Sequence, residues 1–237
     1  MKIHLLAVAF AAVATTASAH DVKSPVDPAK PAPFDITAAS ASTDGRLVTF
    51  AMELAGEAGS IKPEATGRLP GAKVAAYVWP TALDPATAGF AEKSGILALA
   101  ITAHPDFDDT PLFDENGNGD PSDDGESWHS HWVVLGEDAG CGAGLKVLDV
   151  SPGVDILPAT APMLPVALDS PGMSPQFSGT TARITVPVKG GEQAAFDAAT
   201  AELQVNGEGK TPLLCVTGVH DVASGDLSMP GRITKEK

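Results

Sequence analysis

The sequence has few cysteines and few basic residues, and each shortage excludes a class of protein. Only two of its 237 residues are cysteine, and no C-x-x-C or haem-attachment motif is present, which excludes C-x-x-C redox proteins and c-type haem proteins. Lysine and arginine number 15 against 30 aspartates and glutamates, and this acidic balance would repel nucleic acid and anionic lipid. Beyond the first residues no segment approaches ~18 uninterrupted apolar residues, so we expect no membrane insertion.

The N-terminal residues have the pattern of a secretory signal peptide. Lys2 gives a positive start, residues 5–14 are apolar, and Ala17-Ser18-Ala19 is a small-residue cleavage site. We expect residues 1–19 to be removed after Ala19, which leaves a periplasmic or secreted chain. Without its single Lys the formal charge falls from −15 to −16, which suits solubility and cation binding.

Short apolar runs separated by Gly, Pro, Asp and Asn are typical of an all-β protein. The runs predict a β-sandwich of about nine strands with long loops, and a β-barrel is the alternative. The expected strands are 34–42, 46–54, 73–79, 96–102, 129–135, 145–150, 182–188, 200–206 and 213–219. A short helix is expected over 191–200.

The domain organisation follows from the distribution of proline and cysteine. Residues 20–33 form a Pro-rich, extended leader, and residues 34–237 are expected to form a single domain. The segment 151–181 carries six prolines and is either a crossover between sheets or the division between two domains. Cys141 and Cys215 predict one disulfide. Closing that 74-residue loop would stabilise the chain by ~4 kcal/mol.

An acidic, Gly-rich segment suggests a calcium site. "DENGNGDPSDDGE" (114–126) resembles the D-x-N-x-N-G start of calcium loops that occur outside EF-hands in exported proteins. Position twelve is Gly125 rather than Glu, so the loop is not an EF-hand. The alternative is a solvated acidic turn. The candidate oxygen ligands are Asp114, Asn116, Asn118, Asp120, Asp123 and Asp124.

Two histidines directly after this loop suggest a transition-metal site. His129 and His131 lie two apart in a strand, so both project to one face, with Val133 and Leu135. That places the imidazoles ~6–7 Å apart along the chain, close enough to share one ion. His104 and His220 each follow an expected strand and are candidates for further ligands. The set suits Zn²⁺ or Cu²⁺, and the alternative is a pair of histidines bonded to the Asp residues.

Two resemblances bear on these histidines. Cleavage after Ala19 would leave His20 first, and this junction resembles the histidine brace of lytic polysaccharide monooxygenases and CopC-like carriers, which implies copper. The H-x-H pair resembles that of the cupins. However, the Glu that cupins place four or five residues later is replaced by Leu135 and Gly136.

We therefore expect an exported metal-binding β protein, with a histidine-based Zn or Cu site beside a calcium-type loop and metal ions as its partners. Binding is favoured over catalysis, because no nucleophile or nucleotide motif is present. One alternative is a copper- or zinc-dependent enzyme that uses the same histidines. The other is an adhesion or ligand-binding module in which calcium only stabilises the loop.

Overall fold

The computed structural model describes residues 21–63, 69–104, 127–151, 153–162, 164–188 and 190–236. No α-helix occurs within these residues, and the helical turns are the 3-10 turns η1 (Ala32–Phe34) and η2 (Pro85–Ala88). The strands are β1 (Val22–Lys23), β2 (Ile36–Thr43), β3 (Leu47–Leu54), β4 (Lys73–Pro80), β5 (Ile96–Ala103), β6 (His129–Glu137), β7 (Leu145–Val147), β8 (Leu168–Asp169), β9 (Gln176–Ser178), β10 (Thr181–Pro187), β11 (Ala195–Phe196), β12 (Ala199–Val205), β13 (Leu214–Val222), β14 (Gly231–Arg232) and β15 (Thr234–Lys235). The all-β prediction is confirmed, and each of the nine expected strands overlaps one of these.

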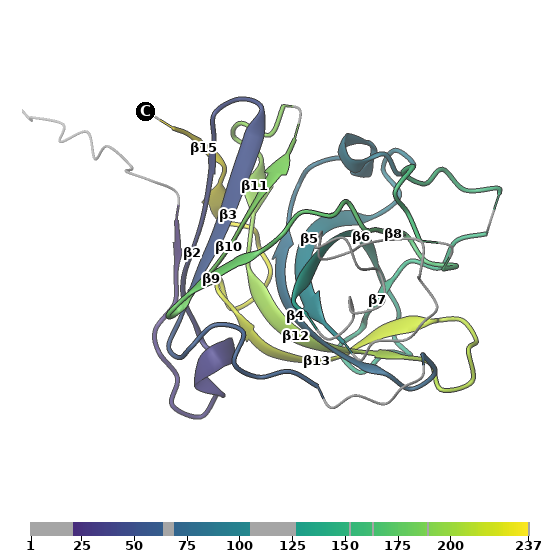
Figure 1. The fold of residues 1–237 in the computed structure, drawn as a ribbon, viewed down its shortest axis with the longest axis horizontal. Helices are drawn as coiled ribbons and strands as arrows, with labels where there is room; N and C mark the ends of the chain where they lie inside the picture. The colour runs from purple at the N-terminus through teal and green to yellow at the C-terminus, as the bar shows by residue number, and fades with distance from the viewer. Residues whose placement is uncertain are drawn as a thin grey trace, which may run out of the picture.

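Six strands close into a barrel. They are hydrogen-bonded in the order β5-β4-β12-β13-β7-β6, and the pairing of β6 with β5 closes the ring. Figure 1 shows this ring, with the short strand β8 attached to β6. A second sheet, β1-β2-β3-β10-β9, stands beside the barrel and carries β15 on β2. The architecture therefore combines the two expected forms, a sandwich in which one layer is a barrel.

Strand β4 shows why the barrel wall is buried on both faces. Tyr77 and Trp79 point outward and belong to the large core cluster that also contains Phe50 of β3. The alternate residues Val74 and Val78 point into the barrel and belong to a separate apolar cluster. Because strand side chains alternate between faces, one strand contributes to both cores. The aromatic residues thus fill the space between the sheet and the barrel.

The segment 191–200 and the N-terminal leader depart from the sequence prediction to different degrees. The expected helix over 191–200 is wrong, because this segment contains β11 and the start of β12. Gln193 has a φ of 66°, which no α-helix contains, and Phe196 is fully buried in the large core cluster between the sheet and the barrel. The leader is extended only in part: Val22 is buried where β1 pairs with β2, whereas Ala32 begins the 3-10 turn η1. The segment between β7 and β10 crosses from the barrel to the sheet.

The join between β7 and β13 has the fewest paired residues in the ring. Only Lys146 and Cys215 pair across it, whereas β12 and β13 pair along their length. The predicted disulfide between Cys141 and Cys215 is present at this join. The backbone N–H of Ala143 also donates to the carbonyl of Val216 at 3.0 Å. The disulfide therefore ties the β6–β7 hairpin to the last strand of the barrel.

A substitution at this join tests how tightly it is packed. A Cβ at Gly142 would lie 2.5 Å from the carbonyl oxygen of Thr217, and backbone atoms cannot rotate away. We expect Gly142→Ala to destabilise the protein by about 1–3 kcal/mol, as overpacking does. The melting temperature should fall by roughly 3–10 °C in thermal unfolding.

The matched control is Gly207→Ala, since a Cβ at Gly207 meets no atom within 4 Å. This variant should melt within about 1 °C of the wild type. Equal melting temperatures for the two variants would show that the backbone at this join can shift to accommodate the added methyl group.

Candidate metal site

The pairing of β5 with β6 brings three histidines together at one end of the barrel. His129 lies opposite Thr102, and His131 lies opposite Ala100. His104 is two residues beyond Thr102, so it continues the same inward-facing row at the end of β5. In an antiparallel pair, His104 is therefore the diagonal neighbour of His129, the residue opposite Thr102. The strand register therefore places His104 beside His129, although 25 residues separate them in the sequence.

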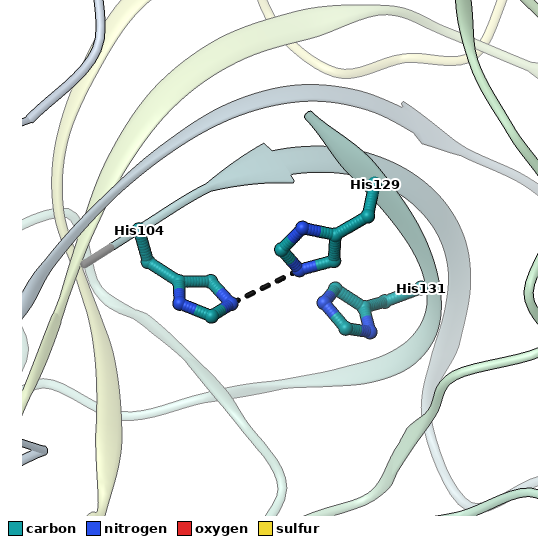
Figure 2. A group of neighbouring side chains, drawn as sticks. All are labelled: His104, His129 and His131. Atoms are coloured by element: carbon teal, nitrogen blue, oxygen red, sulfur yellow. Dashed lines mark hydrogen bonds between the residues drawn. The ribbon is translucent and has the colours of Figure 1, made fainter. Parts of the chain in front are cut away.

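The three rings face one another (Figure 2). Nε2 of His104 lies 3.0 Å from Nε2 of His129. The centroid of the His129 ring lies 4.7 Å from that of His104 and 4.7 Å from that of His131, in edge-to-face geometry. His129 is fully buried, His131 is 4 % exposed and His104 is partly exposed. The sequence prediction that His129 and His131 share a buried inner face with Val133 is confirmed.

Hydrogen bonds fix the orientation of the two buried rings. Nδ1 of His129 lies 2.8 Å from the backbone carbonyl of Ser127, and Nδ1 of His131 lies 3.1 Å from the hydroxyl of Ser170. A carbonyl oxygen only accepts, so Nδ1 of His129 carries a proton, and in the neutral ring Nε2 presents a lone pair. The bond between the two Nε2 atoms then takes its proton from His104.

Burial also decides the charge of His131. Desolvation lowers the pKa of His131 to about 3, and repulsion from a protonated His104 acts in the same direction. A hydrogen bond with the backbone of Asp169 opposes them and is weaker. His131 is therefore neutral at physiological pH. A neutral imidazole has the free lone pair that a metal ion requires.

The arrangement could hold one metal ion. One nitrogen from each of His104, His129 and His131 lies within 4.8 Å of the others. In a tetrahedral zinc site with Zn–N bonds of about 2.0–2.1 Å, ligand nitrogens lie roughly 3.3 Å apart. The 3.0 Å contact is already close to that spacing. The hydrogen bonds at Ser127 and Ser170 are of the kind that orient metal-bound imidazoles through their second nitrogen.

His220 does not join this group. Its ring stacks on Phe34 at 4.7 Å, and its Nε2 lies 3.7 Å from a carboxylate oxygen of Glu202. The pairing of β13 with β12 shifts register twice: Val216 pairs with Leu203 but Gly218 with Glu202, and His220 has no register partner between Val219 and Asp221. The first extra residue reverses the alternation of side chains, so that Val219 rather than His220 lines the barrel cavity.

The remaining predicted ligands lie outside the described residues. These are His20 and the calcium-loop residues Asp114, Asn116, Asn118, Asp120, Asp123 and Asp124. Sequence reasoning missed Thr102, whose hydroxyl lies 3.4 Å from Nε2 of His129, although its place two residues before His104 marks it as inward-facing. It also missed Ser170, for which no local pattern was available.

Comparisons with family models, with curated proteins and with solved structures find no match for this chain. Within the described residues no helix has the length and apolar character needed to cross a membrane.

Proposed function

We propose that this protein is an exported carrier or binder of a transition-metal ion, held by His104, His129 and His131. The observation that carries the proposal is the convergence of three imidazoles at a buried strand end. Two histidines on an apolar inner face cost free energy unless their polar atoms are bonded or bind metal. The disulfide between Cys141 and Cys215 supports export, because such bonds persist in oxidising compartments.

The ligand set favours Cu²⁺ or Zn²⁺ over harder ions. Imidazole suits both metals, whereas calcium prefers carboxylate and carbonyl oxygen. For a given nitrogen site, Cu²⁺ binds more tightly than Zn²⁺. Any calcium bound by the acidic segment 114–126 should therefore be independent of the histidines.

The test is titration of the purified mature protein with Cu²⁺ and with Zn²⁺ by calorimetry. We expect one equivalent per chain with submicromolar affinity for each metal, and Cu²⁺ should displace Zn²⁺. X-ray absorption should then show about three imidazole nitrogens at roughly 2.0 Å. Calcium is the matched control ion and should neither compete with Zn²⁺ nor displace it. Absence of micromolar binding by both transition metals would overturn the proposal.

A metal-dependent enzyme is the second candidate function. Three protein ligands leave a coordination position open, as in catalytic zinc sites, and His104 and His131 border a cavity inside the barrel. The metal would supply Lewis-acid or redox chemistry, while the three histidines hold it and the apolar wall excludes water. If azide perturbs the electron paramagnetic resonance spectrum of the Cu²⁺-loaded protein, an exchangeable position exists. An unchanged spectrum would favour a closed binding site.

A further inference from the structure

The interior of the barrel is lined by aliphatic side chains of modest size. Among the described residues, the inner apolar cluster contains only alanine, valine and leucine, and all the buried aromatic residues belong to the outer cluster. Ala76, Ala100 and Ala201 lie on three neighbouring strands of the wall. A small barrel is normally filled by its own side chains. Here alanine at these positions leaves space unfilled.

The space is a cavity of about 150 Å³. Apart from Thr102, the described residues that line it are aliphatic or sulfur-containing, except at the end where His104 and His131 stand. An apolar cavity of roughly this size in another protein stays dry and admits benzene or xenon. The cavity here therefore combines an apolar chamber with one polar end.

We propose that the barrel is a binding chamber for a small uncharged molecule that has one apolar ring or short chain and one polar head group. The chamber, defined by Ala76, Ala100, Val133, Ala201 and Val216, takes the apolar part. His104 and His131 receive the head group at the polar end. A charged ligand is disfavoured, because the hydrogen bonds that two imidazoles can offer do not repay the desolvation of a full charge.

The proposal does not require the metal, so it is tested on metal-free protein with benzene, phenol and benzoate as probes. Benzene at ten times its dissociation constant should raise the melting temperature by roughly 3–6 °C. Phenol should bind roughly 2- to 10-fold more tightly, because its hydroxyl gains one hydrogen bond at the histidine end. Benzoate should produce no shift.

Two variants separate the chamber from nonspecific binding. Ala201→Leu fills the chamber from the wall opposite the histidine strands and should abolish the response to benzene. Ala55→Leu adds the same atoms at an exposed position and should leave the response unchanged. If Ala201→Leu fails to fold, xenon binding by nuclear magnetic resonance tests the wild-type chamber directly. No benzene shift, no xenon binding, or equal affinities for benzene and phenol would overturn the proposal, whatever the outcome for metal binding.

Discussion

Replacing His129 should lower the affinity for Cu²⁺ and Zn²⁺ by more than about 100-fold. Loss of a residue that merely orients a metal ligand typically costs 10–100-fold, and loss of a ligand itself should cost more. His129 stands between the other two histidines, with ring centroids 4.7 Å from each. The variant His129→Asn keeps a side chain that can still donate to the carbonyl of Ser127, so the local fold should survive. Isothermal titration with each metal measures the loss.

The matched control is His220→Asn, which removes the same chemical group from the opposite side of the barrel wall. His220 stacks on Phe34 outside the histidine group, so this variant should bind both metals like the wild type. Circular dichroism should show that both variants are folded. Equal metal affinity for His129→Asn and the wild type would refute the site, and a loss with His220→Asn would show that the site extends further.

The disulfide should provide the largest single contribution to stability that we predict. Cys141 and Cys215 close a loop of 74 residues, for which the chain-entropy model gives about 4 kcal/mol. The double variant Cys141→Ser/Cys215→Ser should therefore lose about 4 kcal/mol of unfolding free energy, and its melting temperature should fall by roughly 8–16 °C. Urea denaturation of the variant and of the wild type measures the difference.

A reducing agent supplies the control for this prediction. It should destabilise the wild type by about the same amount and leave the double variant unchanged. A loss below about 1 kcal/mol would mean that the pairing of Lys146 with Cys215 and the hydrogen bond at Ala143 hold the join without the covalent bond.

Much of this fold could be predicted from local pattern. Alternation of apolar residues located the nine main strands, and in β6 it also placed His129 and His131 on the inner face. Two cysteines in a chain that the sequence predicts to be exported identified the disulfide. These inferences succeeded because strand periodicity and cysteine pairing are properties of short segments or of residue counts.

The errors came from effects that need long-range information. The segment over 191–200 has alanine-rich composition, but the burial of Phe196 between layers overrides its helix propensity. His220 lies outside the histidine group because the register between β12 and β13 shifts, and no pattern within β13 reveals these shifts. Closure of the ring also depends on β5 meeting β6, and the sequence could not choose between a barrel and an open sandwich.

The order of the barrel strands along the chain favours formation of the histidine group before closure of the ring. β5 and β6 are consecutive in the sequence and already carry the three histidines. The ring, however, also needs β12 and β13, which come after β9 and β10 of the other sheet in the sequence. Contacts between residues far apart in sequence form slowly, because loop-closure entropy opposes them. A metal ion bound to the β5–β6 hairpin during folding would therefore be in place before the chamber closes over it.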